Sequence, residues 1–266
     1  MSNPQAVADR LEAAEQLARS GGEVTLRWFG TQNLGVEHKA DGSPVSLADR
    51  AAEEHIRAAI AEHFPGDAVL GEEFGESPGT SGFRWIIDPI DGTASFIRGV
   101  PLYGTMIGIE LDGEPAAGVV RMPALGETVS GGTNTPARHQ RDHAPDALAR
   151  VSDCANPADA VFVTTSRDYF KETQSLPVHD ALCDTFARSR GWSDCYAYVL
   201  LATGRVDAVV EIGLQPWDWA PLVPIVRAAG GTMTGWEGGP IARRGAVVAT
   251  NTHLHQATLA TIADAT

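Results

Sequence analysis

The sequence has few cysteines, few basic residues and no long apolar runs, and each shortage excludes a class of protein. Its three cysteines, Cys154, Cys183 and Cys195, are an odd number without metal-ligand spacing, so we expect reduced thiols in a cytoplasmic protein. With 20 Lys and Arg against 34 Asp and Glu, the net charge of −14 argues against nucleic acid or an anionic membrane as a partner. No apolar run approaches the roughly 18 residues of a transmembrane helix, and the first residues do not resemble a signal peptide.

What the sequence does contain is the pattern of a large α/β protein. Its 266 residues, 43% of them hydrophobic, can form one large domain or two fused lobes. Because the stretch 134–157 is polar, we place an N-terminal α+β lobe at residues 1–135 and a C-terminal α/β lobe at 136–266.

Periodicity and turn signals predict the elements of both lobes. Helices are expected at 4–28, with a bend or break at Gly21-Gly22, and at 46–64, where Ser46 and Asp49 resemble a capping box. A turn is expected at 41–44. Strands are expected at 68–70, 85–87, 105–111, 115–122, 127–131, 160–165, 207–211 and 246–250, and further helices at 178–189, 193–203, 218–229 and 254–263.

The segment Trp85–Thr93 gives the first sign of a functional site. Its apolar start predicts a short buried strand that stops before Pro89, which cannot donate to a sheet ladder. Asp88 and Asp91 would then lie on a bend at the strand end. Gly92 would let the backbone approach a ligand, and free N–H groups of the next turn would face an anion. Carboxylates beside an anion cradle suggest metal-assisted phosphate chemistry, although an Asx-rich turn without chemistry stays open for this segment alone.

Further acidic residues lie at Asp49, at Glu72-Glu73 and at Asp218, near predicted strand ends or helix starts. Each also has an ordinary explanation. Asp49 suits the first turn of a helix, Asp218 suits an N-cap, and Glu73 suits a solvated neighbour of Glu72.

Taken together, Gly71–Glu73, Asp88–Thr93 and Trp217–Ala220 resemble the inositol monophosphatase family of metal-dependent phosphatases. The spacing of these motifs also resembles that family, and the likeness extends over nearly the whole chain. It implies a layered αβαβα sugar-phosphatase-type fold of two fused lobes. It also implies a small phosphate ester as substrate, two or three Mg²⁺ ions in the site, and a homodimer.

The resemblance assigns roles at the matching positions. Those that would hold Mg²⁺ are Glu72, Asp88, the Ile90 carbonyl, Asp91 and Asp218, with Asp88 bridging two ions. Glu72 and Thr93 would orient the attacking water, and Asp49 would assist there or bind a third ion. Backbone N–H groups of Gly92 and Thr93 would bind the phosphate. Position 95 has Ser where the family often has Asn, so the resemblance does not predict the contact made there.

The segments Gly191–Tyr198 and Gly213–Asp218 look most like those of the family's histidinol-phosphatases, which act in histidine biosynthesis. By this likeness, Asp194 and Glu211 would bind the ammonium of the substrate. An N-cap role for Asp194 stays open. Alternative functions are an inositol-1-monophosphatase or broad sugar phosphatase of the same family, and a non-catalytic relative that binds a metal or metabolite.

Overall fold

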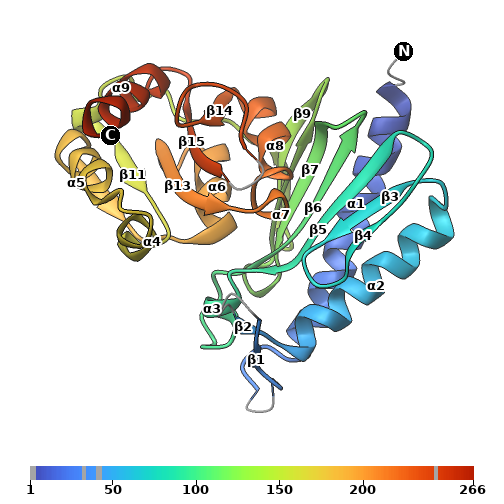
Figure 1. Ribbon diagram of the computed structural model, residues 1–266. Coiled ribbons are helices and arrows are strands. Elements are labelled where there is room, and N and C mark those ends of the chain that lie inside the picture. Colours follow the sequence, from blue (N-terminus) through green and yellow to red (C-terminus); the bar gives the residue numbers. More distant parts are fainter. Residues whose placement is uncertain (1–3, 32–33, 40–43, 243–244) are drawn as a thin grey trace.

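The computed structural model in Figure 1 describes residues 4–31, 34–39, 44–242 and 245–266. Two large β-sheets lie with helices on their outer sides and between them, so the layers alternate α, β, α, β, α as predicted. Within the described ranges, no helix is long and apolar enough to cross a membrane. Most of the turn predicted at 41–44 lies outside the described residues.

The first sheet has eight strands in the part of the chain that the structure describes. Neighbouring strands are antiparallel except for the parallel pair β3 and β5. The predicted hairpin between β6 and β7 is present, with positive φ at Asp112 and Gly113. The order across the sheet is β10 (Ala144–Leu148), β9 (Thr135–Arg141), β8 (Glu127–Gly132), β7 (Glu114–Met122), β6 (Gly104–Leu111), β5 (Phe83–Asp91), β3 (Ala68–Gly71) and β4 (Gly75–Ser77).

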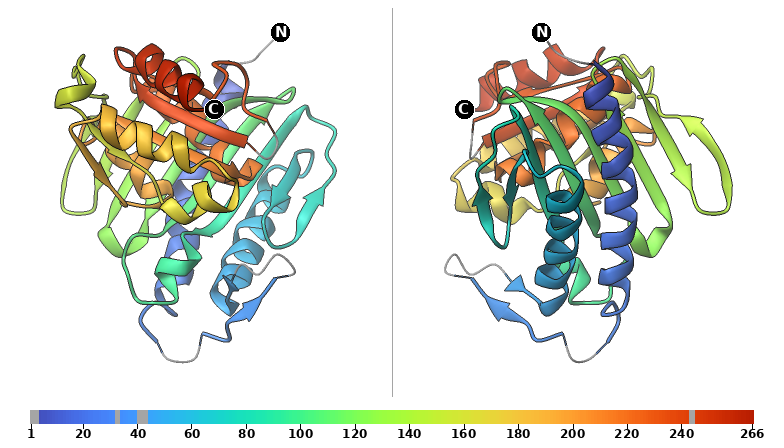
Figure 2. Two further views of the ribbon diagram at one scale, coloured as in Figure 1. Left: turned by 60° about the vertical axis from the view of Figure 1, so that its left-hand side comes forward. Right: turned by 90° about the vertical axis from the view of Figure 1, so that its right-hand side faces the viewer.

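Two long helices, α1 (Pro4–Leu26) and α2 (Leu47–His63), lie side by side on the outer face of this sheet (Figure 2). The break that was one of the two outcomes predicted at Gly21-Gly22 does not occur, because α1 continues through both residues. Because glycine has no side chain, these two positions instead allow close packing of α1 against its neighbours. A Cβ atom on Gly21 would lie 2.8 Å from a methyl carbon of Ile56 on α2, and one on Gly22 would lie 2.8 Å from Pro123.

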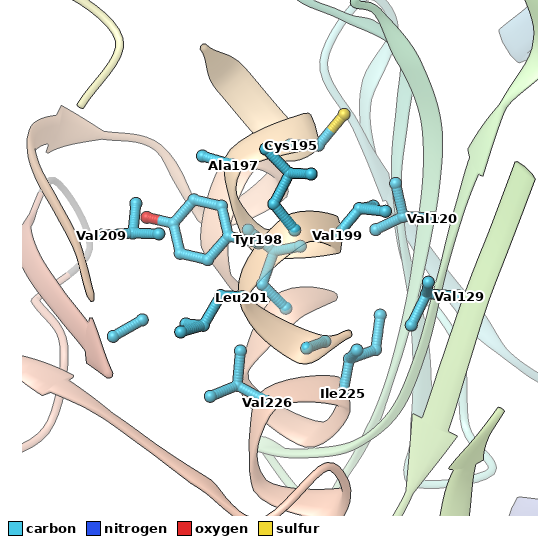
Figure 3. Packing of buried hydrophobic residues seen from close by; sticks show 14 of the residues in the cluster. Val120, Val129, Cys195, Ala197, Tyr198, Val199, Leu201, Val209, Ile225 and Val226 are labelled. Carbon is cyan, nitrogen blue, oxygen red and sulfur yellow. The ribbon is translucent and has the colours of Figure 1, made fainter. Parts of the chain in front are cut away.

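The middle layer is formed by α6 (Asp194–Ala202) and α8 (Leu222–Ala228). Figure 3 shows α6 packed between the two sheets, with Val120 and Val129 of the first sheet on one side and Val209 of the second on the other. These contacts place the N-terminus of α6 beside the end of β5, where Cys195 donates its N–H to Asp91. One hydrophobic core therefore joins the lobes.

The second sheet, as far as it is described, has five strands in the order β12 (Arg188–Arg190), β11 (Val161–Val163), β13 (Ala208–Leu214), β15 (Gly245–Asn251) and β14 (Gly231–Gly235). Its outer face packs on α4 (Arg167–Glu172), α5 (Leu176–Thr185) and α9 (His255–Ala265). The remaining short elements are β1 (Glu37–His38), β2 (Pro44–Val45), α3 (Thr93–Phe96), α7 (Pro216–Trp219), η1 (Pro123–Leu125) and η2 (Pro157–Asp159).

The stretch 134–157, where the lobe boundary was expected, contains β9 and β10. The first sheet therefore extends to Leu148 and the second begins at Val161, whereas the predicted lobe boundary at 135/136 falls inside β9. β10 is the edge strand and β9 lies next to it, and their residues are exposed or only partly buried, with Ala137 a buried exception. Such an edge strand lacks the apolar alternation that identifies a strand in sequence.

Candidate active site

The strand β5 carries the central carboxylates, but it does not stop before Pro89 as predicted. It runs on to Asp91, and its ladder with β6 changes register between Asp88 and Asp91. Pro89 lies within this irregularity, where its missing N–H is tolerated. The Ile90 N–H donates to Asp88 Oδ1 at 3.1 Å, and Thr105 donates to the Pro89 carbonyl at 2.9 Å. These bonds fix the backbone that presents both aspartates.

Three carboxylates from two lobes meet at this strand end. Oxygen atoms of Asp88, Asp91 and Asp218 all lie within 4.8 Å of one another. Asp218 is not the N-cap of its helix, since Gln215 has that position in α7. Asp218 instead accepts the Gln215 N–H at 2.7 Å, and this capping-box bond fixes its side chain.

The acidic cluster fits a divalent cation. Burial, followed by repulsion from neighbouring carboxylates, raises the pKa values of Asp88 and Asp91 well above their usual range. Burial likewise raises the pKa of Asp218 to about 7. Packing carboxylates this closely is unfavourable unless a cation offsets their charge. Because all the donors are oxygens, the set suits a hard ion such as Mg²⁺.

Glu72 joins the cluster from the end of β3. Its N–H donates to the Ile87 carbonyl of β5 at 3.1 Å, and its carboxyl group is within hydrogen-bonding reach of Asp88. Lys39 Nζ lies 2.7 Å from Glu72 Oε1 and 2.6 Å from Glu73 Oε1. Glu73 is therefore not a solvated neighbour, since only 4% of its side chain is exposed.

Lys39 was not among the predicted site residues. Burial opposes its charge, yet the two glutamates outweigh burial and raise its pKa. No local signal marks this lysine, because its partners are 33 and 34 residues away in the chain.

Asp49 lies in the first turn of α2 as a helix-capping acid and also lies beside the site. Ser46 donates to its Oδ2 from the backbone at 2.8 Å and from the hydroxyl at 2.6 Å, which confirms the capping box. Its Oδ1 lies 3.5 Å from the Thr93 hydroxyl, which also lies 3.0 Å from the Ile90 carbonyl. Burial raises the pKa of Asp49 to about 7.

Gly92 lies directly after β5 with φ of 88° and precedes the short helix α3. A Cβ atom here would lie 3.0 Å from Asp194 Oδ2 and 3.0 Å from the Leu102 carbonyl. The positive φ and the close contacts both explain the glycine. They also show that Asp194 reaches the backbone that was predicted to bind phosphate.

Asp194 is held in a left-handed backbone conformation, with φ of 56°, at the start of α6. Its N–H donates to Thr165 Oγ1 at 3.0 Å, and the next N–H, of Cys195, donates to Asp91 Oδ2 at 2.5 Å. The N-cap interpretation of Asp194 is wrong, because Ser193 is the N-cap. Burial raises the pKa of the Asp194 carboxyl.

Glu211 lies buried on β13 and is linked to Asp194 through Thr165. It accepts the Thr165 N–H at 2.6 Å, the Thr165 hydroxyl at 2.8 Å and the Thr164 hydroxyl at 3.3 Å. Burial, only partly offset by these bonds, raises its pKa to about 8. Thr165 was not among the predicted site residues. The polar run directly after β11 is a signal by which it could have been found.

Comparison with known proteins agrees with this geometry. The sequence profile of the inositol monophosphatase family matches residues 7–266. The chain belongs to this family. It is therefore a phosphatase of the family's metal-dependent type.

Two curated relatives are both named histidinol-phosphatase. The protein from Chlorobaculum parvum is 42% identical over 86% of each chain. The protein from Mycobacterium tuberculosis is 38% identical over 94% of this chain and 96% of its own. Among solved structures, an inositol monophosphatase from Zymomonas mobilis superimposes with a TM-score of 0.85 at 34% identity, over 97% of this chain and 99% of that one.

Proposed function

We propose that this phosphatase hydrolyses L-histidinol phosphate to L-histidinol and inorganic phosphate, as a step of histidine biosynthesis. The observation that carries the proposal is the position of Asp194, whose carboxylate reaches Gly92 beside the aspartate cluster. In histidinol phosphate the ammonium is on the carbon next to the ester carbon, so it must lie close to the bound phosphate. A carboxylate at this point can pair with it.

Two or three Mg²⁺ ions would bind in the site. Glu72, Asp88 and the Ile90 carbonyl would hold one ion, and Asp88, Asp91 and Asp218 a second. When bound, the ions would lower the pKa of water and offset the negative charge of the phosphate group.

The chain's own residues would position the reactants. The Thr93 hydroxyl lies between the Ile90 carbonyl and Asp49, so its proton has acceptors on the protein and its lone pairs are free to accept from water. Together with Glu72 it would orient water for attack on phosphorus. The N–H groups of Gly92 and Thr93 would bind phosphate oxygens. Catalysis of phosphoryl transfer depends mainly on such positioning.

The specificity proposal is tested with Asp194→Asn and Glu211→Gln on two esters at saturating Mg²⁺. Both variants should impair hydrolysis of histidinol phosphate much more than that of glycerol 2-phosphate, which has no cationic group. A charged hydrogen bond worth about 1.5–3 kcal/mol corresponds to roughly a tenfold to hundredfold loss in kcat/KM. The measurement is kcat/KM for the three proteins on each ester.

Asn is the matched replacement at position 194, because it tolerates the left-handed backbone that Asp194 adopts. Equal losses on the two esters would show that the carboxylates are structural. If the wild-type protein prefers inositol 1-phosphate, the assignment of histidinol phosphate as substrate is wrong. The assignment of the protein as a phosphatase would still stand.

We also propose that the protein acts in the cytoplasm as a homodimer. The low cysteine content and the family's usual assembly support this proposal. Sedimentation at micromolar concentration tests the assembly, and a monomer would contradict it.

A further inference from the structure

A buried carboxylate outside the proposed site, Glu53 on α2, contacts the backbone directly after Glu72. It has no exposed surface and lies one helical turn beyond Asp49. Its Oε2 accepts the Glu73 N–H at 2.8 Å, and its Oε1 lies 3.3 Å from the Phe74 N–H. These two amide groups lie within the turn between β3 and β4, so Glu53 binds that turn as a helix-capping acid binds free N–H groups.

Arg57, one turn further along α2, completes the contact. Its Nε donates to Glu53 Oε1 at 2.6 Å and balances the buried charge. The rest of its guanidinium donates to the Gly75 carbonyl and, at 3.1 Å, to Ser77 Oγ. The ion pair on α2 therefore holds both ends of the turn that bears Glu72.

Gly71 shows how closely this turn fits against α2. A Cβ atom on Gly71 would lie 1.9 Å from Glu53 Oε1 and 2.4 Å from its carboxyl carbon. The carboxyl group therefore occupies the space that any other side chain at 71 would need. Lys39 also binds both Glu72 and Glu73. Contacts with α2 and with Lys39 thus locate the turn that bears Glu72.

From this arrangement we infer that Glu53 is a positioning residue for metal binding, which holds the backbone so that Glu72 faces Asp88. The inference rests on the proposed role of Glu72 as a metal ligand. An apolar side chain at 53 would leave two turn N–H groups without a buried acceptor, and the turn would be free to rearrange. Residues that orient ligands in this way commonly change metal affinity tenfold to a hundredfold when replaced.

The test measures binding of Mn²⁺ to the metal-free protein by calorimetry. Glu53→Gln keeps the size of the side chain but replaces one acceptor oxygen with a donor. Gly71→Ala disturbs the same contact from the turn. Both should bind the first Mn²⁺ at least tenfold more weakly than the wild type. Glu72→Gln is the reference for loss of the ligand itself.

Asp67→Asn is the matched control for stability. Asp67 precedes β3, its side chain is 1% exposed, and it forms an ion pair with Arg10 at 2.7 Å. This variant should lose thermal stability but keep Mn²⁺ affinity within about twofold of wild type, because its contacts are at the other end of the strand. Glu53→Gln with lowered stability and unchanged affinity would overturn the inference and make Glu53 merely structural.

The reference variant separates this inference from the ligand assignment. If Glu72→Gln also binds Mn²⁺ as the wild type does, the assignment of Glu72 fails. If Glu72→Gln is weakened and Glu53→Gln is not, only the positioning role fails.

A measurement on the unmodified protein tests the hydrogen bonds on which the inference rests, even if a variant does not fold. The amide protons of Glu73 and Phe74 should exchange with deuterium at least tenfold more slowly than exposed turn amides, and slow exchange supports the inference. Exchange at the rate of an unprotected amide would overturn it.

Discussion

At the scale of single residues, the candidate site depends on buried carboxylates. Asp91 shows how one residue serves both fold and site. Its Oδ2 accepts the Cys195 N–H from α6, and its oxygens belong to the cluster with Asp88 and Asp218. The first contact needs only an oxygen, whereas binding a hard cation benefits from the negative charge.

Asp91→Asn should therefore keep the fold and weaken metal binding. The amide oxygen can still accept the Cys195 N–H, but a neutral amide is a poorer ligand for Mg²⁺. We expect the Mg²⁺ concentration for half-maximal phosphate release to rise by about tenfold or more. Circular dichroism checks the fold. Wild-type activity at limiting Mg²⁺ would show that Asp91 is not a ligand.

Thr93→Ala should lower kcat with a smaller effect on KM. The hydroxyl lies 3.0 Å from the Ile90 carbonyl and is placed to orient water, so its loss should affect the transition state more than substrate binding. A loss in kcat of about a hundredfold is expected for a group of this kind. Thr93→Ser, which keeps the hydroxyl, is the control and should retain most of the activity. A burst of alcohol before phosphate release would instead indicate a covalent intermediate.

At the scale of elements, the start of α2 links helix stability to the site. Ser46 caps the helix by accepting the Ala48 N–H at 3.2 Å, and it also donates two hydrogen bonds to Asp49. The same capping box thus stabilises the N-terminus of a helix and orients a carboxylate beside Thr93. Further along α2, Glu53 and Arg57 contact the turn after β3. One face of α2 therefore supports two parts of the site.

Ser46→Ala should cost stability and also disturb catalysis. Loss of an N-cap typically lowers the free energy of unfolding by about 1 kcal/mol. The variant also loses the hydroxyl bond to Asp49 Oδ2, so we expect kcat to fall several-fold. Urea unfolding and steady-state kinetics measure the two effects. Ser166→Ala removes the cap of α4 and is the control: it should lower stability alone. Unchanged kinetics in Ser46→Ala would contradict the link to Asp49.

At the scale of the whole molecule, the site exists only because the two lobes pack together. Asp88 and Asp91 come from the first sheet, whereas Asp218 comes from α7, which follows β13 of the second sheet. The shared core around α6 and α8 brings these segments together (Figure 3). Burial of so many carboxylates in one place makes the stability of the metal-free protein depend on pH.

The metal-free protein should lose stability as pH rises from about 4 to about 8. Burial raises the pKa values of Asp49 and Asp218 to about 7 and that of Glu211 to about 8. The folded state then holds more protons than the unfolded state, whose carboxyl groups titrate near pH 4, so stability falls with pH across this window. Thermal unfolding in EDTA at several pH values measures the effect.

Mg²⁺ should reverse this dependence, because a cation favours the charged carboxylates. We expect it to raise Tm more at pH 8 than at pH 5. The opposite order, or a Tm in EDTA that increases steadily to pH 8, would contradict the prediction.

The sequence alone determined the features that depend on residues close together in the chain. The hairpin at Asp112-Gly113 and the capping box of Ser46 follow from local backbone and side-chain preferences. The motif from Asp88 to Thr93 also lies within six consecutive residues, and the family and its layered fold follow from that motif with two others. The end of the strand that carries this motif was nevertheless predicted wrongly, because β5 continues past Pro89 through a change of register that the partner strand permits.

Only the tertiary structure decided which distant groups meet and how deeply they are buried. Lys39 binds Glu72, and Thr165 binds Glu211, across sequence separations that no local pattern encodes. The largely exposed strands β9 and β10 form through pairing, β9 with β8 and β10 with β9, rather than through an apolar pattern of their own. Hydrogen bonds and charges act over a few ångströms, so their partners are set by the packing of elements. Local preference is set by the nearest residues in the chain.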